Sequence, residues 1–149
     1  ADLLEVLSPF LREWGWKGTV DEFVSTWLKA DHVIDMRIAN AIGELRNKGL
    51  LCCLATNQEH NRANYMRKEM GFEKVFDRLF FSCELGCQKP DLAYFHAVRH
   101  ALRLEASELF LWDDDPKNVE AARECGWEGE VYHSFEAFRE LVRVYEEKL

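Results

Sequence analysis

From Leu50 onward, short apolar runs alternate with amphipathic segments, and this alternation restricts the fold more than any other feature of the chain. The runs 50–55, 79–81, 109–112 and 130–132 have the continuous apolar character of strands that are buried on both faces of a sheet. Segments with helical spacing follow them, at about 59–70, 91–104, 116–126 and 134–145. The alternation predicts an α/β fold, with a parallel sheet covered by helices on both faces.

The first fifty residues predict helices only. Ser8-Pro9 is typical of a helix start, because Ser caps well and Pro is favoured at the first helical position. Thr19 and Glu22 have the spacing of a capping box, which predicts a second helix. A third helix carries Ile38, Ala39, Ile42 and Leu45, and Gly49 is its expected stop.

Composition limits the classes of partner. The 149 residues, of which 48% are hydrophobic, are enough for the core of one domain. A net charge of -8 without a Lys/Arg cluster argues against nucleic acid, and no apolar run approaches the ~20 residues of a membrane helix. Five cysteines, two of them inside an apolar run, favour reduced and buried thiols, so we expect a soluble cytoplasmic protein without membrane or nucleic-acid partners.

Polar residues of useful chemistry follow three of the predicted strands. Thr56 and Asn57 follow the first strand, Lys89 comes after the second in a loop, and Asp113-Asp114-Asp115 follow the third. Ligands bind at the carboxyl ends of the strands in sheets of this kind, so these side chains are expected on one rim.

Each group also has a plain structural interpretation. Thr56 and Asn57 could hold an anion or simply cap a helix, and Lys89 could be a solvated loop residue. Acidic side chains favour helix N-termini, but that effect explains three adjacent carboxylates with difficulty. A bound Mg²⁺, which prefers one or two carboxylates with water and substrate oxygens, would relieve their repulsion. Together the groups suit phosphoryl transfer, in which positioning and charge neutralisation do most of the work.

These polar motifs resemble those of a known family. Thr56-Asn57, Lys89-Pro90-Asp91 and the stretch 113–118 are similar to the second, third and fourth motifs of the haloacid dehalogenase (HAD) superfamily of hydrolases. The similarity covers about residues 32–145, with the motifs in the family's order. It implies a Rossmann-like α/β core at 32–149, preceded by a partial α-helical cap at 1–31.

The resemblance also implies roles for individual residues. Thr56 would hydrogen-bond the transferring group, Asn57 would orient the substrate, and Lys89 would neutralise charge. Asp113 and Asp114 would bind Mg²⁺, and Asn118 would support their loop. Asp115 departs from the pattern, since many members carry Ser there. The implied activity is that of a Mg²⁺-dependent phosphatase acting on a small phosphorylated substrate, in preference to a dehalogenase, which does not need the carboxylate metal site.

One family motif has no counterpart in these 149 residues. The first motif is a strand that ends in Asp-x-Asp, supplies the nucleophile, and lies mid-sheet between the strands that end at Thr56 and Asp113. The carboxylates at 113–115 cannot replace it, because the Thr and Lys motifs would then lie on the wrong side of it in the chain. Either the sequence is a piece of a longer protein, which we expect, or another chain supplies the strand. We expect the 149 residues alone to be inactive.

Other interpretations explain less. Receiver domains also use acidic residues, a Thr and a Lys around one Mg²⁺, but their acidic pair precedes the Thr and the Lys in the chain, whereas here it follows them. A P-loop ATPase needs a G-x-x-x-x-G-K-[ST] loop, which this sequence does not contain. His96 and His100 have a metal-like spacing but no Glu after the first His, so surface histidines are expected. A non-catalytic binding or regulatory protein that kept the fold remains the alternative function.

Overall fold

The structure is a computed structural model that describes residues 3–146. In chain order, the elements are α1 (Leu3–Glu13), α2 (Val20–Ala30), α3 (Met36–Asn47), β1 (Cys53–Thr56), α4 (His60–Lys68), α5 (Phe72–Val75), β2 (Arg78–Phe81), α6 (Ser82–Leu85), α7 (Leu92–Leu102), the 3₁₀ turn η1 (Ala106–Glu108), β3 (Phe110–Asp113), α8 (Pro116–Glu124), β4 (Glu128–Val131) and α9 (Phe135–Glu146). The predicted α/β class with parallel strands is confirmed.

Within residues 3–146, the four strands form two separate parallel pairs. β1 pairs with β2, and β3 pairs with β4, with Leu54 opposite Leu79 and Leu111 opposite Gly129. Among the described residues, no strand pairing joins β1 to β3. The expected single sheet is therefore divided in its middle.

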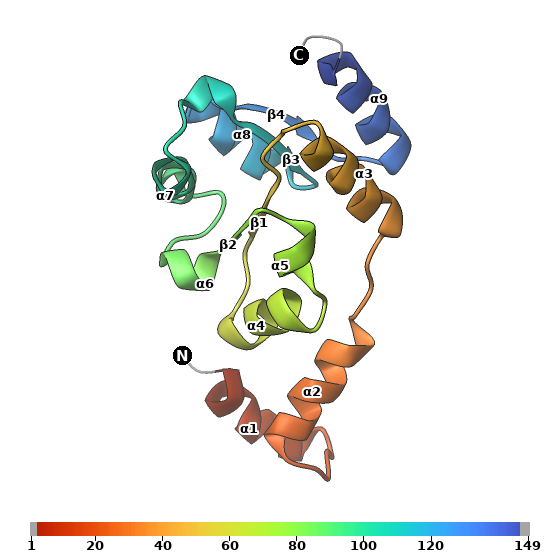
Figure 1. Ribbon diagram of the computed structural model, residues 1–149. Coiled ribbons are helices and arrows are strands. Elements are labelled where there is room, and N and C mark those ends of the chain that lie inside the picture. Colours follow the sequence, from red (N-terminus) through yellow and green to blue (C-terminus); the bar gives the residue numbers. More distant parts are fainter. Residues whose placement is uncertain (1–2, 147–149) are drawn as a thin grey trace.

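Helices cover both faces of the two strand pairs (Figure 1). Tyr94 and Phe95 of α7 and Ala122 of α8 pack on one face. That cluster includes Phe80 from the first pair and Leu111 from the second, so one core spans both pairs. On the other face α3 and α9 pack together over Trp112, and α4 packs over Leu54 and Phe81; these two clusters contain the buried residues Ala41, Leu45, Phe138 and Val142, and Ala63, Met66, Met70 and Phe81.

A cavity of about 750 Å³ lies between the two strand pairs. Its wall residues include Cys53 and Ala55 of β1, Phe110 and Trp112 of β3, and Trp127. We call this cavity the interstrand slot.

The first helices form a hairpin that is set apart from the core and joined to it by residues 31–35 (Figure 1). The capping box of α2 is confirmed, since the Glu22 N–H donates to the Thr19 hydroxyl and the Thr19 N–H donates to Glu22. The predicted start of α1 at Ser8-Pro9 is wrong: α1 begins at Leu3 and carries Pro9 inside it. Leu3, Leu7 and Leu11 share one face, and their burial against α2 compensates for the hydrogen bond that Pro9 removes.

Several predicted boundaries also shift. β1 begins at Cys53 rather than at Leu50, and Leu51 is largely exposed. β4 begins at Glu128, two residues before its predicted start, because its N–H pairs with the Leu109 carbonyl oxygen. Gly129 fits there because a Cβ would lie 3.0 Å from the Leu111 carbonyl oxygen. The loop after β2 contains the single turn α6, which the sequence pattern did not predict.

None of the helices within residues 3–146 is both long enough and apolar enough to cross a membrane. The five cysteines, all within the described residues, are free and half-buried.

Candidate active site

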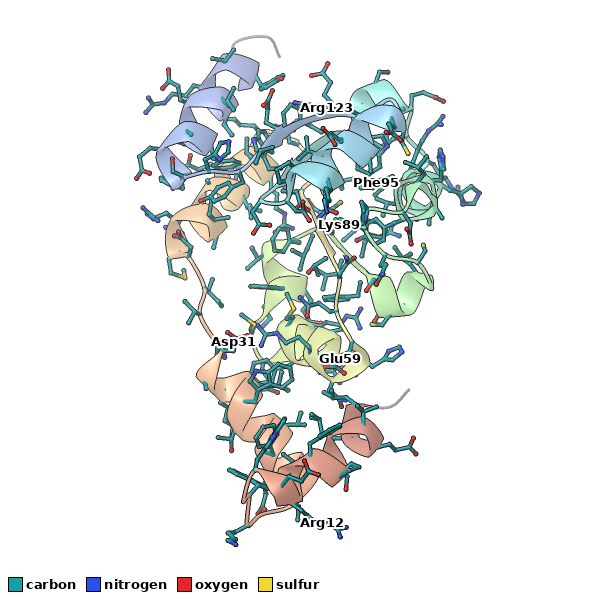
Figure 2. All side chains as sticks on the ribbon, turned by 180° about the vertical axis from the view of Figure 1, so that it is seen from behind. Arg12, Asp31, Glu59, Lys89, Phe95 and Arg123 are labelled. Carbon is teal, nitrogen blue, oxygen red and sulfur yellow. The ribbon has the colours of Figure 1, made fainter. Side chains whose placement is uncertain are left out.

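Lys89 joins the two strand pairs at their carboxyl ends. Its ammonium donates to the Ala55 carbonyl oxygen of β1 at 2.9 Å and forms an ion pair with the Asp113 carboxylate at the end of β3. The two side chains are only 8% and 6% exposed, and Lys89 lies near the centre of the molecule (Figure 2). A buried charge of each sign is tolerated here because each has the other as its partner. Lys89 is therefore not a solvated loop residue.

Asn57 holds the backbone of the Lys89 loop. Its side-chain amide donates to the Lys89 carbonyl oxygen at 2.8 Å, and its amide oxygen accepts from the Lys89 N–H at 2.9 Å. The loop enters a cis peptide bond between Lys89 and Pro90. The two hydrogen bonds from Asn57 fix the position of the Lys89 backbone, from which its side chain extends. In this structure Asn57 therefore positions Lys89.

Asp113 accepts hydrogen bonds on both carboxylate oxygens. Besides Lys89, the Asn118 side chain and the Asp115 N–H each donate at 2.9 Å. Burial alone would raise the pKa of Asp113, but these three donors outweigh it and hold that pKa below its usual range. Asp113 is thus ionised at neutral pH, as a metal ligand must be.

Asp114 and Asp115 differ from Asp113 in their surroundings. Asp115 caps α8, and its carboxylate accepts from the Lys117 N–H at 2.9 Å, with Pro116 in the first turn. Asp114 is exposed. The helix-capping interpretation therefore holds for Asp115 alone, while Asp113 pairs with Lys89 and Asp114 is exposed.

Thr56 lies at the end of β1, and its hydroxyl accepts from the Gln58 side chain at 3.1 Å. Ser82, which directly follows β2, connects the two strand ends: its hydroxyl accepts from the Gln58 N–H at 3.0 Å and donates to the Gln58 carbonyl at 3.2 Å. No role was predicted for Ser82 from the sequence, although a hydroxyl immediately after a strand was a signal. Asp91 precedes α7, and within residues 3–146 its side chain makes no capping hydrogen bond.

The site thus brings Thr56, Asn57, Lys89 and Asp113 to one rim, where the strand-end argument placed them, and Asn118 bonds to Asp113 there. Hard oxygen ligands are available from Asp113 and the neighbouring Asp114, and Mg²⁺ needs only one or two carboxylates from the protein. Within residues 3–146, no three His, Cys, Asp or Glu side chains converge on a common point. The residues fit Mg²⁺ provided that water or substrate supplies its remaining ligands.

Cysteine and histidine chemistry lies elsewhere. Burial raises the pKa of the Cys53 thiol to about 11, so this thiol is protonated at neutral pH and is a poor nucleophile. His96 and His100 are exposed on α7, as expected for surface histidines.

Comparison with known proteins identifies the family. The model of haloacid dehalogenase-like hydrolases matches residues 17–126. The chain belongs to this family. Its HAD fold also appears in solved structures. An uncharacterized protein from Corynebacterium glutamicum is 28% identical, with a TM-score of 0.63 over 73% of this chain and 78% of that one.

Two further relatives carry functional descriptions. A HAD family enzyme from Bacteroides thetaiotaomicron, in complex with magnesium and inorganic phosphate, is 23% identical, with a TM-score of 0.62 over 67% of this chain and 53% of that chain. The sesquiterpene phosphatase astK of Aspergillus oryzae is 32% identical over 96 residues, which are 64% of this chain and 48% of that protein. The HAD chain thus spans about half the length of this curated relative.

Contacts at residues 31–35 connect the helical hairpin to the HAD core. Arg62 of α4 pairs with Asp31 at 2.6 Å, and the His32 ring lies 3.0 Å from the Tyr65 hydroxyl. A second hollow of about 310 Å³ lies between the hairpin and α4, where Asp21, Ser25, Asn61, Asn64, Lys68 and Glu69 contribute polar groups.

Proposed function

We propose that this chain is most of a Mg²⁺-dependent HAD phosphatase that acts on a small phosphorylated substrate. In this proposal the nucleophilic aspartate lies on a segment that the 149 residues do not include. The observation that carries the proposal is the buried Lys89 ammonium, which the chain holds beside Asp113 on the rim of the two strand pairs. A fixed positive charge next to an ionised carboxylate suits a site that neutralises a phosphoryl group and holds a divalent cation.

Each site residue has a role in the proposal. Lys89 neutralises charge on the nucleophile and the phosphoryl group, and Asn57 positions Lys89. The Thr56 hydroxyl lies at the same rim and donates to the phosphoryl group. Asp113 and Asp114 hold Mg²⁺, which stabilises the charge of the transferring group when it is bound. Asn118 keeps the Asp113 carboxylate in place.

Two findings on relatives support the reaction class. The Aspergillus oryzae relative is named a phosphatase, and the Bacteroides thetaiotaomicron enzyme was solved with magnesium and inorganic phosphate. The domain division is part of the proposal, with a partial cap at 1–31 and a core at 32–149; residues 1–2 and 147–149 lie outside the described residues. A cytoplasmic location is likewise proposed, on the composition alone.

A non-catalytic binding protein is the second candidate, and one observation favours it. Lys89 and Asp113 neutralise each other, so this chain satisfies its central charges without a phosphoryl group or a cation. A chain that had become a binding module would need such a pairing.

A fusion separates the two candidates. A strand ending in Asp-x-Asp is attached before Ala1 through a Gly/Ser linker of about 12 residues, whose mean reach is roughly 20 Å. We expect this fusion protein to release phosphate from p-nitrophenyl phosphate in the presence of Mg²⁺. The reaction should stop when EDTA is added. The matched control carries Asn in place of the first Asp of the fused strand. A fusion that folds, binds Mg²⁺ and shows no more turnover than this control would favour the binding module.

A further inference from the structure

The Thr56 hydroxyl accepts a hydrogen bond but, within residues 3–146, donates none. A threonine hydroxyl has one proton to donate and two lone pairs with which to accept. Here one lone pair is used by the side-chain amide of Gln58, at 3.1 Å. An accepted bond leaves the hydroxyl proton available and polarises it toward a further acceptor. Thr56 is therefore prepared as a hydrogen-bond donor.

The three side chains that follow Thr56 have different partners. Asn57 binds the Lys89 backbone through both its amide nitrogen and its amide oxygen. The Glu59 carboxylate accepts from the first N–H groups of α4 and so caps that helix. Of these three side chains, Gln58 is the one that binds the Thr56 hydroxyl. The bond thus comes from a side chain whose neighbours are committed elsewhere.

Ser82 holds the backbone of Gln58. Its hydroxyl accepts from the Gln58 N–H at 3.0 Å and donates to the Gln58 carbonyl oxygen at 3.2 Å. The strand register explains this contact, because Thr56 lies opposite Phe81 and the residues that follow the two strands become neighbours. The single proton of Ser82 is used by the Gln58 carbonyl, so Ser82 is not a second free donor. It fixes the point from which the Gln58 side chain extends.

The free proton of Thr56 belongs to the same strand end as the central ammonium. Lys89 donates to the carbonyl oxygen of Ala55, the residue directly before Thr56. The bonds of Gln58 to Thr56 and to Ser82 are partly buried, and such surroundings strengthen a hydrogen bond. A cation and a prepared hydroxyl proton on neighbouring residues of β1 form a donor set for the oxygens of an anion.

We propose that Gln58 is a positioning residue for the phosphoryl group. Its amide keeps the Thr56 proton directed toward a phosphoryl oxygen, and Ser82 keeps Gln58 in place. Without this amide the hydroxyl can rotate and donate to a carbonyl oxygen of its own loop, which removes it from the phosphoryl group. The inference rests on the proposed function, in which Thr56 donates to the phosphoryl group, and it adds two residues to that site.

The first test measures the hydrogen bond without phosphate. The chain contains two glutamines, Gln58 and Gln88, and Gln88 is exposed, so their side-chain amide signals in an NMR spectrum form a matched pair. The variants Gln58→Met and Gln88→Met assign the two signals. We expect one Gln58 amide proton to exchange with water at least about fivefold more slowly than those of Gln88. Thr56→Val should remove this difference, and Thr56→Ser should retain it. Equal exchange of the two glutamines in the unmodified chain would overturn the inference.

The second test measures the affinity of the 149-residue chain for inorganic phosphate by calorimetry at saturating Mg²⁺. We expect Thr56→Val to weaken phosphate binding by at least about tenfold, because a bond to a charged oxygen is lost, and Gln58→Met to weaken it by about fivefold. The double variant should bind as Thr56→Val does, because Gln58 acts through Thr56. A Gln58→Met effect that is equally large in the Thr56→Val chain would overturn the inference.

Two further variants test the support and the specificity. We expect Ser82→Ala to weaken phosphate binding by about threefold in the chain with Gln58 and to have no effect in Gln58→Met. Gln88→Met is the matched control, since it makes the same substitution at an exposed glutamine, and it should leave the affinity unchanged. Thermal unfolding confirms that each variant folds. Equal losses in Gln58→Met and Gln88→Met would overturn the inference.

The two tests separate this inference from the proposed function. Phosphate binding that depends on Thr56 but not on Gln58 would retain the proposed function and overturn the inference. Slow exchange of Gln58 that depends on Thr56, without any phosphate binding by the unmodified chain, would reject the phosphoryl role that the proposed function gives to Thr56, and the inference with it.

Discussion

Lys89 and Asp113 form a buried ion pair that joins the β2–α7 loop to the end of β3, across the place where the strand ladder is interrupted. Lys89 also bonds to β1, so one ammonium holds both strand pairs at their carboxyl ends. The pair is thus a structural element of this chain as well as the centre of its candidate active site.

Removing one partner of this pair should lower the free energy of unfolding. Lys89→Met leaves the buried Asp113 carboxylate without its cation, and we expect a loss of about 3 kcal/mol in the free energy of unfolding. Urea unfolding measures it. Lys117→Met is the matched control, because Lys117 is exposed, and it should change stability by less than about 0.5 kcal/mol. Equal stabilities of the two variants would contradict the structural role of the pair.

The same pair predicts a dependence on pH. The pKa of Asp113 is lower in the folded chain than its ordinary value of 3.8. The stability from this group is therefore complete above that ordinary value and is lost as the pH falls through the lower, folded value. Unfolding free energies measured from pH 7 downward should fall less steeply below pH 3.8 for Asp113→Asn than for the unmodified chain.

Mg²⁺ binding should depend on Asp113 and on its support. We expect Asn118→Ala to weaken Mg²⁺ binding by about tenfold, because it releases one oxygen of the Asp113 carboxylate. Asp113→Asn should weaken it further, and Asp114→Asn should weaken it as well. Isothermal calorimetry measures the affinity, with Glu120→Gln on the exposed side of α8 as the control. Affinities for Asp113→Asn that equal those of the control would remove Asp113 from the metal site.

Asn57 should act through the Lys89 loop. Asn57→Ala removes two hydrogen bonds to the Lys89 backbone, and we expect a loss of about 1–2 kcal/mol. Hydrogen exchange of the Lys89 amide should accelerate in this variant and remain unchanged in Gln88→Ala, which alters an exposed residue of the same loop. Slow exchange in Asn57→Ala would mean that other contacts hold the loop.

Local signals in the sequence predicted most of the elements. The Thr19–Glu22 capping box, the helix stop at Gly49 and the helix start at Pro116 depend on neighbouring residues alone, so the sequence predicted them correctly. Pro9 misled the prediction of α1, because burial of the leucines on its inner face outweighs the local signal. The early start of β4 depends on its pairing with β3, which no local pattern contains.

The candidate site likewise combines features that the sequence predicted with features that it did not. The strand-end positions of Thr56, Lys89 and Asp113 followed from the alternation of strands and helices. The bonds between Asn57 and the Lys89 backbone, and the shared contacts of Gln58 and Ser82, join segments that are 24 or more residues apart. Such bonds depend on how the loops pack, so they could not be predicted from the sequence.

Hydrolysis of p-nitrophenyl phosphate by the 149-residue chain itself tests the central claim most directly. The chain is purified without any added strand and assayed with Mg²⁺ and with EDTA. We predict no phosphate release above the EDTA control, because the proposed nucleophile lies outside these residues. Clear Mg²⁺-dependent turnover that Asp113→Asn abolishes would contradict this account, since the described residues would then contain a complete catalytic site.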